Sequence, residues 1–176
     1  MIGTADLHAA IEAKWNTEVV DSDTSPTDTL NDIFKALWNP QVDANQFTVL
    51  SDTESSPHQP FPYCICQTEL PRVLHRMTGE DGCKREIRNV KLTFKVFADV
   101  VQGDKRSAKQ IAGYLAEQVM KVFGGHPTKP ATEMELTNGG TLPSQFGVDY
   151  SVRDENLYKW IWVIQYNLML DVPVAI

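Results

Sequence analysis

The sequence has few cysteines, no long apolar run and no recognisable catalytic signature. Its 176 residues include three cysteines, a small and odd number that favours reduced thiols and a cytoplasmic setting. No apolar stretch approaches the roughly 20 residues of a membrane-spanning helix, so we expect no membrane partner. The first ten residues have neither a basic start nor an apolar core, and they give no sign of export. Neither a phosphate-binding glycine loop nor a Ser–His–Asp signature is present, so we do not expect an enzyme.

Basic residues are also in the minority, because 16 lysines and arginines face 23 acidic residues and give a net charge of −7. Such a surface repels nucleic acids and anionic membranes unless a local patch overrides the field. The length and the hydrophobic content of 42% are ordinary for a globular protein. We therefore interpret residues 1–176 as a single domain.

Two stretches alternate apolar and polar residues, as strands with one buried face do. They are 84–101, whose apolar positions run from Val90 to Val100, and 157–172. An apolar stripe at helical spacing over 104–123 follows the first strand, and we expect this helix to lie on one sheet face. The order of elements predicts an α+β fold, with a mainly antiparallel, twisted sheet and two or three helices on one face.

Further elements are predicted with shorter patterns. Residues 5–16 form a helix with Leu7, Ile11 and Trp15 on one edge, and a second helix begins at Ser25–Asp28 and ends before Pro40. Stretch 71–82 ends in Gly-Glu-Asp-Gly and predicts a hairpin whose second arm is strand 84–101. The remaining predicted strands are 47–50, 63–70, 132–137 and 148–152.

The second face of strand 157–172 is half apolar, with Ile161, Val163 and Met169 among its residues. Such a face is unlike one that is simply exposed to water. It is covered either by a second layer of the same chain or by a neighbouring subunit. We expect the neighbouring subunit.

Cys64-x-Cys66, with His75 and Cys83 downstream, is the one group with metal-ligand residue types. Cys-x-Cys places both sulfurs on one side of a strand, whereas zinc sites usually separate cysteines by two residues so that a turn wraps the ion. A nucleophilic cysteine needs a base, and neither His75 nor His58 belongs to a local signature. We interpret the cysteines as small buried residues, and we expect no metal and no cofactor.

A basic cluster lies on the predicted hairpin of this otherwise acidic protein. It is a solvated hairpin or, alternatively, a contact for phosphates or for an acidic partner. The complementary acidic segment holds Glu18, Asp21, Asp23, Asp28 and Asp32. Copies with separated charges can join head to tail, and such contacts close into rings where the rotation allows. The basic cluster consists of Arg72, His75, Arg76, Lys84, Arg85, Arg88 and Lys91. The candidate partner-contacting residues are Arg72, Arg76, Arg85, Arg88, Lys91, Lys95, Ile161, Val163 and Met169.

Four stretches together resemble the tail terminator (tail completion, minor tail) proteins of long-tailed bacteriophages and prophages. They are the helix motif Ala9–Trp15, the loop and strand Pro57–Cys64, the strand Arg85–Phe97 and the aromatic strand Tyr158–Asp171. Residues 16–40 and 128–144 depart from that pattern.

The resemblance implies a small domain that assembles as a homo-hexameric ring on the last ring of the tail tube. Such a ring stops tube polymerisation, docks to the head–tail connector and lets DNA pass through its lumen without specific binding. It also implies a place in the virion tail, reached from the host cytoplasm during assembly. Two alternatives stay open: a head-closure or neck protein, and a nucleic-acid-binding accessory protein that uses the basic hairpin.

Overall fold

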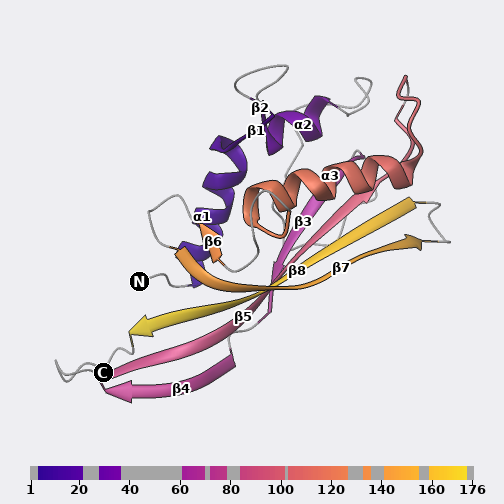
Figure 1. Ribbon diagram of the computed structural model, residues 1–176. Coiled ribbons are helices and arrows are strands. Elements are labelled where there is room, and N and C mark those ends of the chain that lie inside the picture. Colours follow the sequence, from indigo (N-terminus) through magenta and orange to yellow (C-terminus); the bar gives the residue numbers. More distant parts are fainter. Residues whose placement is uncertain are drawn as a thin grey trace.

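Two long antiparallel strands, β5 (Lys84–Ala98) and β8 (Lys159–Pro173), form the centre of the fold in the computed structural model (Figure 1). The sheet order is β3-β5-β8-β7-β6, and β4 also pairs with β5. β1 and β2 form a separate two-stranded sheet. The structure describes residues 4–21, 28–36, 61–69, 72–78, 84–101, 103–126, 133–135, 141–154 and 159–173.

All strand pairings within these residues are antiparallel, and three helices accompany them. The expected α+β class and its antiparallel sheet are thereby confirmed. The helices are α1 (Thr4–Thr17), α2 (Leu30–Ala36) and α3 (Ala108–Phe123). The other strands are β1 (Val19–Asp21), β2 (Asp28–Thr29), β3 (Tyr63–Thr68), β4 (Arg72–Thr78), β6 (Glu133–Glu135) and β7 (Thr141–Asp154).

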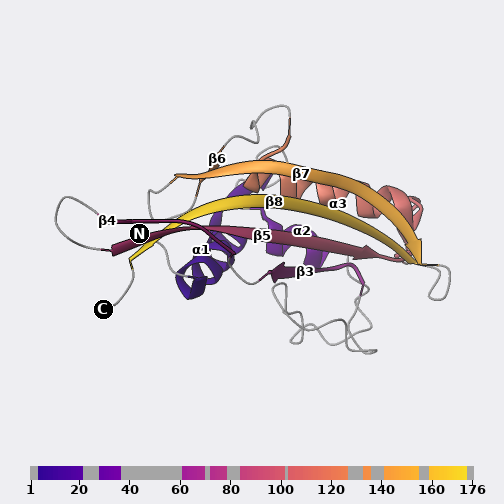
Figure 2. The same ribbon diagram turned by 90° about the horizontal axis from the view of Figure 1, so that it is seen from below.

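β3 and β4 lie one after the other along the same edge of β5. β3 pairs with Leu92–Phe97, and β4 pairs with Lys84–Asn89. The predicted hairpin is thus present, although its turn lies outside the described residues. The helices lie over the part of the sheet that contains β3, whereas β4 extends away from them (Figures 1 and 2). The sheet therefore has a covered half and a half that extends past the helix layer.

The core lies between the helices and one face of the sheet. On β5 the predicted alternation is confirmed, since Val90, Leu92, Phe94, Val96 and Ala98 are all buried. Alternate residues of β3 and β8 share that face through the register of the strands. Cys64 and Cys66 therefore belong to the core, as expected for small buried residues. The predicted extension of the buried face to position 100 is wrong, because β5 ends at Ala98 and leaves the next apolar position, Val100, 67% exposed.

Aromatic rings fill the space between α1, α2, α3 and β5. Trp15 contacts Phe34 at 5.1 Å between ring centroids, and Phe94 stacks on Phe123 at 4.8 Å. The rings of Tyr166 and Phe94 are perpendicular, with 6.0 Å between their centroids, and the Tyr166 hydroxyl donates to the Gly124 carbonyl at 2.7 Å. Aromatic pairs in these geometries add about 0.5–1.5 kcal/mol to the free energy gained from burial.

Helix α3 begins at Ala108, four residues later than the predicted segment 104–123. Ser107 is its N-cap, because the Ser107 hydroxyl accepts from the Gln110 amide at 3.4 Å and the Gln110 side chain accepts from the Ser107 amide at 2.8 Å. This capping box satisfies two N–H groups that the helix start would otherwise leave open. The helix ends at Gly124 and Gly125, whose φ angles of 117° and 96° favour glycine.

The N-terminal helices follow the prediction in part. Leu7, Ile11 and Trp15 of α1 are buried, as their spacing predicts. The predicted start of the second helix is wrong, because α2 begins at Leu30. Thr29 caps it: its hydroxyl accepts from the Asp32 amide at 3.3 Å, and the Asp32 carboxylate accepts from the Thr29 amide at 3.0 Å.

The weaker strand predictions were right in place and imprecise in length. β6 covers three of the residues predicted at 132–137, and β7 is much longer than the predicted 148–152. The strand predicted at 47–50 lies outside the described residues, as does Ser25. None of the described helices has the length and apolar character needed to cross a membrane.

Candidate interaction surface

β4 and the start of β5 form a two-stranded arm, which we define as Arg72–Thr78 together with Lys84–Asn89. Every residue of β4 is exposed, in contrast to the neighbouring strand β3, whose first four residues are buried. Figure 1 shows β4 at the lower left, away from the three helices. Within the arm β4 pairs with β5, and β5 pairs on its other side with β8. The side chains of β4 are thus available to another molecule.

The strand register divides the predicted basic cluster between two faces of the arm. Arg76 lies opposite Glu86, on the face that carries Arg88. Arg72 lies opposite Asn89, and Arg85 opposite Met77, on the other face. The sequence predicted one cluster, whereas the structure places its cations on both sides.

Glu86 connects the two strands of the arm through hydrogen bonds. Its carboxylate accepts from Arg76 Nε at 2.8 Å on β4, and from Arg88 Nε and Nη2 at 3.0 and 2.8 Å on β5. Only 4% of Glu86 is exposed. Hydrogen bonding to Arg88 and then to Arg76 lowers the pKa of Glu86 and outweighs the opposing effect of burial. Two predicted contact residues, Arg76 and Arg88, are therefore engaged within the chain.

Apolar side chains are exposed beside these charges. Leu74 is 52% exposed, and Val73 and Met77 are also exposed. The register of β4 shifts between Val73 and His75, as in a β-bulge around Leu74. Natural edge strands usually avoid such exposed apolar residues, because an open edge templates pairing with other chains. This composition favours a partner for β4.

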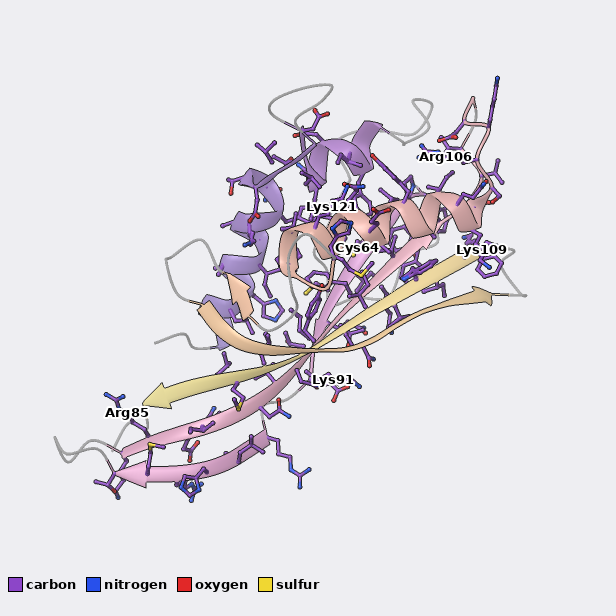
Figure 3. The ribbon with its side chains drawn as sticks, viewed as in Figure 1. Cys64, Arg85, Lys91, Arg106, Lys109 and Lys121 are labelled. Atoms are coloured by element: carbon purple, nitrogen blue, oxygen red, sulfur yellow. The ribbon has the colours of Figure 1, made fainter. Side chains whose placement is uncertain are left out.

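A cavity of about 430 Å³ opens on the arm. Its lining includes two cations of β5, Lys84 and Arg85, and Arg76 of β4; Figure 3 shows Arg85 on the arm, far from Arg106 and Lys109. Glu86 is the one acidic residue in its described lining. The cavity thus has an excess of positive charge. Its described lining consists of Arg76, Met77, Thr78, Lys84, Arg85 and Glu86.

The other predicted contact residues lie farther along β5 and β8. Lys91 pairs with Glu69 at 2.9 Å, and Lys95 and Ile161 are half-buried on the sheet face away from the helices. Met169, on the same face, is 47% exposed. Val163 is only 6% exposed, so its side chain is already covered within a single copy. Its proposed contact with a partner is therefore not available in this conformation.

The sheet face away from the helices is less open than its half-apolar pattern suggested. Tyr63, Ile65 and Thr93 are buried there, like Val163. Tyr63 stacks on Phe97 with 4.7 Å between ring centroids, and this contact accounts for part of the burial. We expected a neighbouring subunit to cover this whole face. That expectation is wrong for the part near β3, which is buried within the single chain.

The acidic segment of the sequence lies with α1, α2, β1 and β2. Glu18 forms an ion pair with Lys14 at 2.8 Å, and Asp32 caps α2. Asp28 is half-buried in β2, and Glu12 is exposed on α1. Figure 1 draws α2, β1 and β2 at the top, whereas the arm is at the bottom. The two charged regions are thus well separated within one chain.

The cysteine group does not assemble into a site. Cys64 and Cys66 pair with Val96 and Phe94, whereas His75 pairs with Ile87, seven residues and about 23 Å away along β5. Figure 3 shows Cys64 between the sheet and α3. Burial, and then the neighbouring Cys66, raise the pKa of the Cys64 thiol. Cys83 lies outside the described residues, within which no three potential metal ligands come together.

Sequence reasoning missed Glu86 and the apolar residues of β4. Glu86 is the one acid in the basic run Lys84–Arg88, and that was the available signal. Its partners depend on the register of β4 against β5, which the sequence pattern alone does not fix.

The chain was compared with protein families, curated proteins and solved structures. No protein-family model matches the chain, and no curated protein matches its sequence. A solved structure described as the virion of a native gene transfer agent particle is similar, with a TM-score of 0.47 and 12% identity over 94% of this chain and 95% of that one. At that TM-score the likeness carries no argument about function.

Proposed function

We propose that this chain is a structural subunit of a phage-like tail, a terminator that assembles as a ring on the end of the tail tube. In this role it stops tube polymerisation and docks to the head–tail connector. The sequence resemblance described above suggests the role. The observation that carries it is the arm, whose β4 strand exposes apolar and basic side chains with no layer of the described chain over them.

An arm of this kind is suited to subunit contacts. A strand of seven residues is about 23 Å long, and its outer edge offers backbone groups as well as side chains. Met169 adds an exposed apolar side chain on the neighbouring β8. Stable protein contacts usually need at least about 1,000 Å² of buried surface, so we expect the arm to be one part of a larger contact.

The proposal is tested by electron microscopy and native mass spectrometry of the purified chain, alone and with tail tubes. We expect rings that bind one end of each tube and prevent further growth. A chain that stays monomeric at high concentration, and also with tubes, would contradict the proposal. Binding to heads rather than tubes would instead indicate the head-closure or neck role.

DNA binding by the arm is the second candidate, and exposed Arg72 and Lys84 favour it. The pairing of Arg76 and Arg88 with Glu86 weakens it, because those two cations already have a carboxylate partner. The net charge of −7 instead suits a lumen through which DNA slides without binding. Salt-dependent DNA binding that is lost in an Arg72→Glu/Lys84→Glu variant would support this second function.

We also propose that the role is not catalytic. A thiol with a raised pKa is a poor nucleophile, because the thiolate is the reactive form, and this applies to buried Cys64. Replacing Cys64 by serine should then leave ring assembly intact. Metal analysis of the purified chain tests the expected absence of a metal.

A further inference from the structure

The chain separates its charges more strongly than its net charge suggests. Residues 4–36 hold seven acidic and two basic residues, whereas residues 72–91 hold six basic and three acidic ones. The described members of the first group lie with the helices, and those of the second lie on the arm and next to it (Figure 1). In each region the excess charge is turned outward: Glu12 and Asp32 are exposed at one end, and Arg72 and Lys84 at the other.

We propose that the arm of one copy docks on the acidic end of a second copy, which we define as Glu12, Glu18, Asp28 and Asp32. This inference rests on the proposed function and names the contact between neighbouring subunits. Arg72 and Lys84 are exposed on the arm, and Lys84 also lines its cavity, so the arm presents positive charge to a carboxylate of the neighbour. The contact is electrostatically complementary, which sets its orientation and speeds association.

Apolar residues lie beside the charges on both surfaces. On the acidic end, Val19, the first residue of β1 and the neighbour of Glu18, is 46% exposed. On the arm, Val73, Leu74 and Met77 are exposed. Docking would remove these side chains from water while the charges around them pair. A second copy therefore suits the arm better than a polyanion, which would leave the apolar residues uncovered.

The contact joins two different surfaces, so an open assembly has a free arm at one end and a free acidic end at the other until it closes. Such a head-to-tail contact produces a ring when the rotation per subunit closes, and an open filament when it does not. Rings of this chain would therefore contain as many arm contacts as subunits.

The test uses charge reversal on each side of the contact. Arg72→Glu/Lys84→Glu reverses exposed cations of the arm and leaves the Glu86 ion pairs in place. Glu12→Lys/Asp28→Lys reverses the acidic end without removing the α2 cap at Asp32. Sedimentation of each variant should show association weakened roughly 100-fold, because like charges then face each other. Combining all four substitutions should restore association, since the complementarity returns with opposite sign.

The matched control for the arm variant is Lys105→Glu/Lys121→Glu, which lowers the net charge by the same amount at residues outside the arm. It should associate like the wild type, and circular dichroism should show that every variant is folded. Rings that persist in the arm variant would overturn this inference and leave the proposed function standing. A combined variant that stays dissociated while the control assembles would have the same consequence. A wild-type chain that never assembles would overturn both. Loss of DNA binding with unchanged assembly would assign the arm to nucleic acid and also overturn it.

Discussion

The two halves of β5 differ although they belong to one strand and share one partner, β8. In the covered half, Leu92, Phe94 and Val96 are buried beneath the helix layer. In the arm, the same strand face carries Glu86 and Arg88 in an ion pair. The backbone pairing with β8 continues unchanged from Arg85 to Ala98. The difference therefore lies in the side chains of each half and in what covers them, and not in the pairing of the strand.

This comparison separates two sources of stability. The covered half is held by burial of apolar surface, at about 25 cal/mol per Å² removed from water. The arm is held by strand hydrogen bonds and by the ion pairs of Glu86, and its apolar residues remain in contact with water. The covered half should set the global stability, and the arm should open locally at a lower free energy.

The largest expected effect comes from truncating one side chain in each half. Phe94→Ala removes a buried ring that contacts Phe123 and Tyr166, and it should lower the free energy of unfolding by about 3–5 kcal/mol. Leu74→Ala on the arm should change it by less than about 0.5 kcal/mol, because that side chain is already exposed. Urea unfolding followed by tryptophan fluorescence measures both. Equal losses would show that the arm is part of the cooperative core.

A smaller effect is expected where α3 approaches the sheet. A Cβ atom added at Gly113 would lie 3.2 Å from the Trp162 ring, which leaves no room for a branched side chain. Gly113→Val should cost about 1–3 kcal/mol through overpacking. Gly113→Ala should be close to neutral, because a gain in helix propensity of about 1 kcal/mol offsets the displacement of the ring. Thermal unfolding of the two variants checks the expected order, and a stabilised valine variant would contradict it.

The cap of α3 gives the next effect. Ser107→Ala removes the hydroxyl that accepts from the Gln110 amide, and it should cost about 1 kcal/mol. Ser107→Asp keeps an acceptor at the same place and should preserve most of that stability. Urea midpoints of the two variants give the comparison. If the two substitutions were equally destabilising, the capping box would not be the source of the effect.

Sequence patterns predicted the covered half well, because there each element obeys one period. The alternation along β5 and the stripe of α3 both follow from burial against a single layer. The start of α2 was predicted wrongly, since Ser25 and Thr29 both have the side chains of a helix cap. Tertiary contacts decide between two such caps, and sequence does not rank them.

The candidate surface was predicted only in its composition. That the hairpin carries cations is plain from the sequence, but the face that each one occupies depends on the register of β4 against β5. The same holds for Glu86, which finds Arg76 only through that register. The burial of Tyr63 and Ile65 was not predicted either, because the sequence has no helical pattern that indicates a layer over the second sheet face.

The ion pairs of Glu86 give the most local prediction. Replacing Glu86 by glutamine removes the charge that Arg76 and Arg88 share, and β4 should then open more often at pH 7. Hydrogen-exchange protection, corrected for intrinsic rates, should fall for the amides of Val73–Met77. The amides of Leu92–Val96 should be unaffected, since they lie in the covered half.

The same carboxylate makes the stability of the arm depend on pH with a defined sign. Because the arginines lower the pKa of Glu86 below its ordinary 4.5 in the folded chain, the unfolded chain binds a proton first as the pH falls. The stabilisation is therefore complete above that ordinary value and is lost as the pH falls through the lowered one. Wild-type protection of β4 should decline over this acidic range, while Glu86→Gln should show no such decline. A variant with the wild-type pH dependence would place the titrating group elsewhere and would remove Glu86 as the residue that holds the arm.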